Sequence, residues 1–335
     1  MSARSTIGRR LAGRITRIGM AFALAAGLIT AVSFGAAQPA SALQSCPAPT
    51  QPPVAGIEYW IQQYSGNGVT VCWGMDNAGG IAQLAAVMQI VDLADGAQVR
   101  LRSDYVCPPG GCPGVFAPDT QFEKHTAEEW HDLWGGGSGG PGTLFSTTNA
   151  GFFKDDRNPT TALTFPQLTT GSVTSYGYAF YGGPDFTNAK ASLTLGPPGL
   201  GQAVKMRNFG PEYAILNVNQ HWGCNTSGHG CTAGYDGTVG FHPAVNLTGN
   251  PDDVARRTMV GVNASVNVNA SRVYILTTVR SYKLADARQM LKYFGSQSEV
   301  QLDGGGSTSS ISEYHQIDST IFRPVPQVLM VYSAP

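Results

Sequence analysis

Charged side chains are scarce in this chain, and basic ones do not predominate. Only 13% of its 335 residues are charged, whereas about 25% is usual for a soluble domain. Residues 1–42 hold five arginines and no acid. Without them the count of Lys and Arg falls from 21 to 16 against 22 Asp and Glu, a net charge of −6. Because nucleic acids and anionic lipid surfaces are bound through basic groups, this balance argues against both as partners.

Long hydrophobic runs are also missing after residue 42, since none approaches the roughly 20 residues that a membrane helix needs. We therefore expect no membrane span in the mature chain. Residues 1–42 differ: a basic start is followed by the apolar run Ala21–Phe34 and by the small residues Ala40-Ser41-Ala42. This is the pattern of a secretory signal peptide, and Arg9-Arg10 leaves general secretion and the twin-arginine route both open. It predicts a secreted, extracellular protein, with a retained amphipathic anchor as the alternative.

Cysteines are few, and all follow the predicted signal peptide. An even number of cysteines in an exported chain indicates disulfides. Six cysteines allow fifteen pairings, but two short segments, CPPGGC and CNTSGHGC, are rich in turn residues that suit closed local loops. We therefore predict the pairs Cys107–Cys112 and Cys224–Cys231, which leave Cys46–Cys72 as the third.

One cysteine segment also resembles a zinc site. In HWGCNTSGHGC, four possible ligands lie close together: His221, Cys224, His229 and Cys231. In an oxidising compartment the two thiols are expected to pair with each other instead of with a metal. We therefore expect no metal site and no cofactor.

The chain divides into three parts by composition. After the signal peptide, residues 43–55 form a proline-rich leader, which should be extended. Residues 56–333 then form one domain, with an apparent insertion at about 107–142 that includes a short helix at His125–Trp134. Low charge and 42 glycines predict short strands separated by glycine-rich loops.

The last third of the domain has the clearest pattern. Val273–Thr278 is a buried type of strand, Leu284–Gly295 has apolar residues at helical spacing, and Glu299–Asp303 is a second strand. A strand, a helix and a strand at this spacing predict a βαβ unit with parallel strands and a right-handed crossover. The expected fold class is α+β: a mixed β-sheet core with a C-terminal βαβ unit, flanking helices and long glycine-rich loops.

A run of three glycines follows the second of these strands, in Asp303-Gly304-Gly305-Gly306-Ser307. Ligands of open α/β sheets bind at the carboxyl ends of strands, and successive glycine amides can form a concave anion site. The Gly-Lys-Ser/Thr ending of a nucleotide-binding P-loop is absent. The run therefore predicts either an anion site or an ordinary turn.

Four stretches in order resemble one family. NAGFF (149–153), RRTMVGV (256–262), ADARQMLKYFGSQSEVQLDGGGSTS (285–309) and RPVPQVLMV (323–331) are similar to motifs of the phosphodiester glycosidases, which include the uncovering enzyme and secreted bacterial relatives. The chain departs from the family pattern at Ala150, which replaces a glycine. It also lacks the Asp-Gly that usually follows the strand before the helix.

The resemblance implies hydrolysis of a sugar-1-phosphodiester, with a sugar phosphate or a glycopolymer as the substrate. It implies catalytic roles for Asp303, Arg257 and Asn149. It implies substrate contacts from Gly304, Gly305, Gly306, Ser307, Thr308, Thr258 and Arg323. A phosphate group needs a clamp for its developing charge, and a carboxylate can steady the positive anomeric carbon.

Two other functions are compatible with the same residues. A secreted protein that binds carbohydrate or a cell-wall polymer without turnover would need the fold alone. A serine hydrolase would use Ser307 with His221 or His315, but the G-x-S-x-G turn of such enzymes is absent.

Overall fold

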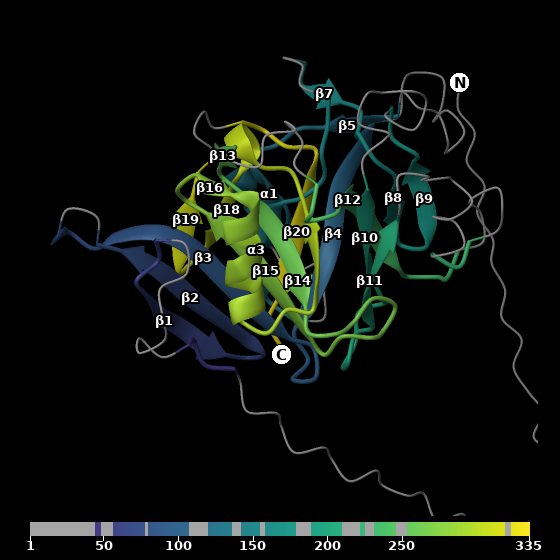
Figure 1. Cartoon of the computed structure of the whole chain (residues 1–335). Helices are drawn as coiled ribbons and strands as arrows, with labels where there is room; N and C mark the ends of the chain where they lie inside the picture. Colours follow the sequence, from purple (N-terminus) through teal and green to yellow (C-terminus); the bar gives the residue numbers. More distant parts are fainter. Residues whose placement is uncertain are drawn as a thin grey trace, which may run out of the picture. The chain divides into compact units, whose positions relative to one another are not determined.

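The computed structural model is built mainly of β-sheet: among the residues that it describes, 49% lie in strands and 11% in helices (Figure 1). All elements described here belong to the compact unit Ala40–Pro335. The structure describes residues 44–47, 56–77, 80–106, 120–135, 142–154, 158–178, 189–209, 222–224, 231–245, 253–318 and 323–335. No helix in these ranges is long and apolar enough to cross a membrane.

The larger sheet has eleven strands: nine in the order β1-β2-β3-β15-β14-β17-β12-β10-β11, with β8 paired to β12 and β9 paired to β8. Every strand pair described in it is antiparallel. Its strands are β1 (Tyr59–Gly66), β2 (Val69–Asp76), β3 (Gln83–Asp92), β8 (Gln167–Thr169), β9 (Ser172–Ser175), β10 (Lys190–Leu195), β11 (Val204–Phe209), β12 (Asp236–Phe241), β14 (Thr258–Val262), β15 (Arg272–Thr278) and β17 (Ser298–Gln301).

The smaller sheet has seven strands in the order β19-β18-β6-β20-β4-β5-β7, again all antiparallel. Its strands are β4 (Gln98–Val106), β5 (Gln121–Glu123), β6 (Leu144–Asn149), β7 (Thr160–Thr161), β18 (Ser310–Ser312), β19 (His315–Ile317) and β20 (Gln327–Tyr332). The remaining elements are the ribbon of β13 (Val254–Ala255) and β16 (Tyr282–Lys283), the helices α1 (Ala127–Gly135) and α3 (Leu284–Tyr293), and the 3-10 turn η4 (Gly305–Ser307).

The two sheets share one hydrophobic core. Successive side chains of a strand point to opposite faces. In β15, Val273 and Ile275 therefore join the core between the sheets, while Tyr274 and Leu276 face the cluster that α3 covers. In β20, Leu329 enters the shared core and its neighbours enter the cluster around Trp130 of α1. Burying such a side chain contributes about 1.5–3 kcal/mol, so this alternation sets the register of both sheets.

The prediction of an α+β fold with a parallel βαβ unit was wrong. The strand, the helix and the strand are present, as β15, α3 and β17. However, β14 lies between the two strands and pairs with each of them in the antiparallel sense. The segment TMVGV, which forms β14, is buried throughout. After β15 the chain returns through α3 to β17, which lies two strand positions from β15 in the sheet. The two strands therefore run in the same direction without pairing with each other.

Two predicted disulfides are confirmed. Cys46 is bonded to Cys72, and Cys224 is bonded to Cys231, so these last two thiols are not zinc ligands. The predicted pair Cys107–Cys112, the signal peptide at 1–42 and most of the leader at 43–55 lie outside the described residues. So do His221 and His229.

Candidate functional site

The glycine loop begins where the two sheets meet. β17 pairs with β14 in the larger sheet, and the amide of Leu302 still donates to Thr258 O at 3.0 Å. One residue later, the amide of Asp303 donates to Ala150 O at 2.8 Å, just after β6 of the smaller sheet. The chain therefore passes from one sheet to the other at Asp303. Its carboxylate is half-buried at the end of both sheets.

Asn149 ties three segments together at this point. Its side-chain amide donates to Asp303 O at 2.7 Å. Its side-chain oxygen accepts hydrogen bonds from Thr258 Oγ1 at 2.7 Å and from the Ser309 amide at 3.0 Å. Both Asn149 and Thr258 are fully buried. In this geometry both side chains position the loop, and a direct contact of either one with a substrate stays a prediction.

The three glycines have different environments. Gly305 has a φ of +60°, which favours glycine, and a Cβ there would meet no protein atom within 4 Å. A Cβ on Gly304 would lie 2.8 Å from Arg256 O, so this position requires glycine for packing. The Gly304 amide donates to Asp303 Oδ1 at 3.0 Å and the Gly305 amide to Arg256 O at 2.8 Å. These two amides therefore already have acceptors within the protein.

Two buried hydroxyl groups follow the glycines. Ser307 and Thr308 are both 0% exposed. Within the part of the chain that the structure describes, neither Ser307 Oγ nor Thr308 Oγ1 has a hydrogen-bond partner. Buried hydroxyls normally have one, so these two groups are suited to a ligand.

The two arginines of the predicted phosphate clamp, Arg323 and Arg257, lie in different surroundings. A Cβ on Gly306 would be 3.9 Å from Arg323 Nη1, so the Arg323 guanidinium borders the glycine loop. It also lies over the ring of Phe153, 4.7 Å from its centroid. The Arg257 guanidinium donates to Tyr282 O at 3.3 Å and to Asp253 O at 3.2 Å. Burial lowers the pKa of Arg257, and the nearby carboxylate of Asp253 opposes this.

One buried cation near this site gave no signal in the sequence. Lys190, at the start of β10, is 0% exposed, and its Nζ lies 5.5 Å from the ring centroid of Phe165 and 5.6 Å from that of Phe241. Phe152 packs edge-on against both rings. Lys190 is paired across the sheet with Phe241, which is paired in turn with Gln301 of β17. A lone lysine in a strand pattern is typical of an exposed face, so only the structure locates it here.

The histidine proposed for a serine hydrolase is engaged elsewhere. His315 accepts or donates at both ring nitrogens, with Ser310 Oγ 2.8 Å from Nε2 and Ser312 Oγ 2.8 Å from Nδ1. Burial lowers the pKa of His315 to about 4. Ser307 is not among these partners, and His221 lies outside the described residues. The geometry therefore does not form a Ser307–His315 pair.

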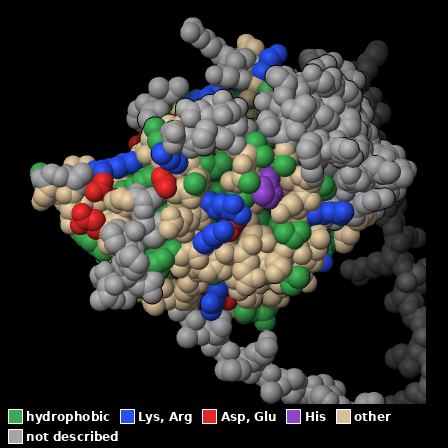
Figure 2. Space-filling view, in the orientation of Figure 1, with side chains coloured by type: hydrophobic (Ala, Val, Ile, Leu, Met, Phe, Trp, Pro, Cys, Tyr) green, Lys and Arg blue, Asp and Glu red, His purple; other side chains and the backbone are tan. Residues whose placement is uncertain are grey.

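A cleft of about 380 Å³ lies beside α3, away from the glycine loop. Figure 2 shows Lys and Arg side chains gathered near the middle of the face on which α3 lies. The cleft is lined by Pro243, Ala244, Leu284, Ala285, Arg288, Gln289 and Lys292. Arg288 is already 3.3 Å from Glu299. Arg288 is therefore already paired within the protein, and the residues that line the cleft include no Asp, Glu or His. The glycine loop remains the candidate site.

Three structural neighbours of the chain, all distant, are described here. No family model and no curated protein matches the chain. A hypothetical protein from Synechocystis matches at 12% identity and a TM-score of 0.43, over 85% of this chain and 64% of that one. The catalytic domain of zebrafish N-acetylglucosamine-1-phosphodiester alpha-N-acetylglucosaminidase, auto-inhibited by its pro-peptide, matches at 13% and 0.43, over 80% and 83%. A putative exported protein from Burkholderia pseudomallei matches at 12% and 0.36, over 75% and 74%. Likeness at this level does not establish a function, which must be argued from the residues.

Proposed function

We propose that the chain is a secreted hydrolase that cleaves a sugar-1-phosphodiester into a free sugar and a phosphomonoester. The sequence motifs that resemble the phosphodiester glycosidases support this proposal, because NAGFF, RRTMVGV, LDGGGS and RPV come together around Asp303. The single observation that carries it is the pair of buried hydroxyls, Ser307 and Thr308, which lack partners within the described residues next to Arg323.

The reaction would replace the phosphate at the anomeric carbon by water. A bond forms between the water oxygen and C1, and the bond between C1 and the phosphate oxygen breaks with its electron pair on that oxygen. The water's extra proton leaves to the phosphate or to solvent. A phosphodiester is a good leaving group, so a strong general acid is less necessary than in ordinary glycosidases.

Each part of the loop has a role in this proposal. Ser307 and Thr308 donate hydroxyl hydrogen bonds to phosphate oxygens, and Arg323 supplies positive charge as the leaving group gains negative charge. Gly305 and Gly306 allow the phosphate to approach the backbone closely. Asp303 stabilises the positive charge that develops on the sugar or activates the attacking water. Arg257 can join the clamp only by exchanging its bonds to Tyr282 and Asp253.

A panel of sugar-1-phosphodiesters tests the proposal. The purified protein should release reducing sugar and phosphomonoester in equal amounts from at least one member. In water labelled with oxygen-18, promptly quenched, the label should enter the sugar at C1, because the C1–O bond breaks. Label in the phosphate would show a phosphodiesterase that breaks the P–O bond, and would contradict the proposal.

A carbohydrate-binding protein without turnover is the second candidate. One observation favours it: the amides of Gly304 and Gly305 and the guanidinium of Arg257 already have partners in the protein. Fewer groups are then available to stabilise a transition state. Saturable binding of an intact phosphodiester or cell-wall polymer, with no product after prolonged incubation, would support this second function.

A further inference from the structure

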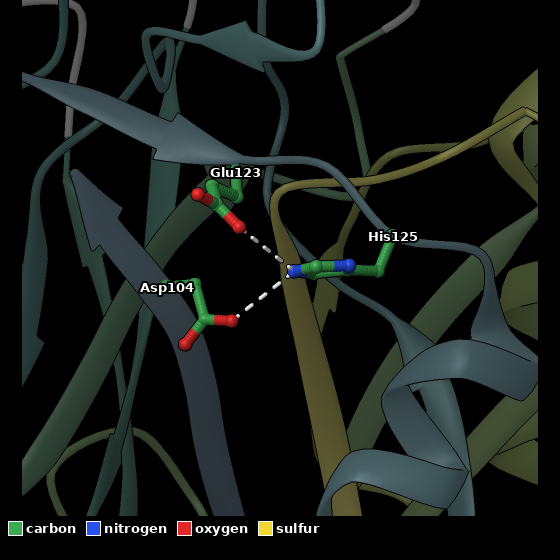
Figure 3. A group of neighbouring side chains, drawn as sticks. All are labelled: Asp104, Glu123 and His125. Carbon is green, nitrogen blue, oxygen red and sulfur yellow. Dashed lines mark hydrogen bonds and ion pairs between the residues drawn. The ribbon is translucent and has the colours of Figure 1, made fainter.

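Three ligand-type side chains converge on one face of the smaller sheet, outside the glycine loop. Asp104 of β4 is paired across the ladder with Glu123 of β5, so their side chains leave the sheet on the same face. His125 follows Glu123 by two residues, and alternation places it on that face too. Figure 3 shows the two carboxylates and the imidazole pointing toward one another from these segments.

The distances among the three groups suit a common ligand. His125 Nε2 lies 3.1 Å from Asp104 Oδ2 and 3.7 Å from Glu123 Oε2. The three ligand atoms all lie within 4.8 Å of one another. Two ligands of one tetrahedral zinc ion are about 3.3 Å apart, given bonds of about 2.0–2.1 Å. A small shift of the exposed Glu123 would bring all three groups to that spacing.

The imidazole is held in place by groups that do not belong to the cluster. Its ring packs edge-on against Trp130 of α1, with centroids 4.7 Å apart. Trp130 is fully buried, and its Nε1 donates to Val325 O at 2.9 Å. The backbone of His125 forms a bridge to the same residue, Val325. The ring is therefore oriented toward the carboxylates before any ion arrives, which favours binding.

The charges at this point also favour a bound cation. Two carboxylates directly opposite each other on neighbouring strands repel, which destabilises the pairing. The side chains of Asp104, Glu123 and His125 are 41%, 55% and 21% exposed. An ion bound by these three would therefore keep an open side toward solvent, with water as its remaining ligand.

We propose that Asp104, Glu123 and His125 form a binding site for one divalent transition-metal ion of the zinc type. The donor set of one imidazole nitrogen and two carboxylate oxygens decides the class, because imidazole suits zinc and its neighbours, whereas calcium and magnesium prefer oxygen alone. This differs from our sequence-based expectation of no metal. The bound ion has ligands from β4, from β5 and from the segment that leads into α1. It therefore links these segments and stabilises this part of the smaller sheet.

The test uses the full mature chain with its disulfides oxidised and without a histidine tag. Isothermal titration with Zn²⁺ should show one saturable site per chain. The variants His125→Gln and Glu123→Gln should bind at least tenfold more weakly. Glu128→Gln removes a charge from α1 outside the cluster and should bind Zn²⁺ as the unchanged protein does.

Thermal unfolding is the second measurement. A hundredfold excess of Zn²⁺ over its dissociation constant should raise the Tm by about 5 °C, and only where the cluster is intact.

Three results would overturn the proposal. Absence of saturable binding would mean that His125 is only an ion-pair partner of the two carboxylates. Binding that is unchanged in both Glu123→Gln and His125→Gln would place the ion elsewhere. Loss of binding in His229→Ala, with the cluster variants unaffected, would assign the ion to the segment 221–231 instead. Glu123 is more than half exposed, so its variant should fold and keep the test decisive even where His125→Gln does not.

Discussion

The side-chain amide of Asn149 donates a 2.7 Å hydrogen bond to the backbone carbonyl of Asp303, although 154 residues separate the two in sequence. Asn149 ends β6 in the smaller sheet, and Asp303 follows β17 in the larger one. The same side chain also accepts from Thr258 and Ser309. One buried amide therefore joins the two sheets at the place where the glycine loop begins.

We expect Asn149→Ala to unfold at a lower temperature than the unchanged protein. The substitution removes three hydrogen bonds and leaves Asp303 O without that donor, at a cost of about 2–4 kcal/mol. Thermal unfolding of the mature chain measures this. Asn77→Ala is the matched control, because Asn77 also donates a 2.7 Å bond from its side chain but this bond is exposed to solvent, so it should change stability by less than about 0.5 kcal/mol. Equal effects of the two variants would contradict the linking role.

Asp303→Asn should reduce the rate without unfolding the protein. The substitution keeps the shape and the acceptor oxygen near the Gly304 amide, but it removes the charge that the proposed reaction uses at the transition state. The loss in kcat should be about a hundredfold or more, with the Tm nearly unchanged. Asp318→Asn removes a charge from an exposed position and should keep full activity. An active Asp303→Asn protein would show that the loop is only structural.

Thr308→Val and Thr258→Val should separate binding from stability. Both threonines are 0% exposed, and valine has nearly the same shape. Thr258 Oγ1 donates to Asn149, so Thr258→Val should lose about 1 kcal/mol of stability. Thr308 Oγ1 has no partner within the described residues, so Thr308→Val should keep its Tm but raise the KM for a phosphodiester. A lower Tm and an unchanged KM in Thr308→Val would contradict its role in binding.

The sequence was informative where a pattern is local. The helix at 284–293, the strand before Asp303 and the disulfide Cys224–Cys231 could be predicted, because helical periodicity, glycines and cysteine spacing are local signals. The disulfide Cys46–Cys72 followed only by elimination. The parallel βαβ unit was wrong because strand order depends on which segment lies between two strands. Nothing in Thr258–Val262 indicates that it separates β15 from β17.

The candidate functional groups show the same limit. Asp303 and its glycines are consecutive, so the sequence brings them together by itself. Lys190 and the cluster of Asp104, Glu123 and His125 depend on cross-strand register, which a single sequence does not specify. A lysine among strand residues and two acids 19 positions apart give no pattern before the strands are paired.

Stability should fall between about pH 6.5 and pH 4 because of His315. Burial lowers the pKa of this imidazole from 6.5 to about 4 in the folded protein, where Ser310 and Ser312 bond both ring nitrogens. In the unfolded chain the imidazole binds its proton near pH 6.5, whereas the folded protein resists it until about pH 4. The free energy of unfolding is therefore unaffected by this group above pH 6.5 and declines as the pH falls, by about 3 kcal/mol in total.

His315→Gln should remove this part of the pH dependence, measured as the Tm from pH 7 to pH 4. Burial also lowers the pKa of His242, but this side chain is only half-buried, so the control His242→Gln should retain most of the decline. If the decline persists in His315→Gln, carboxylates are its source and His315 does not limit stability in acid.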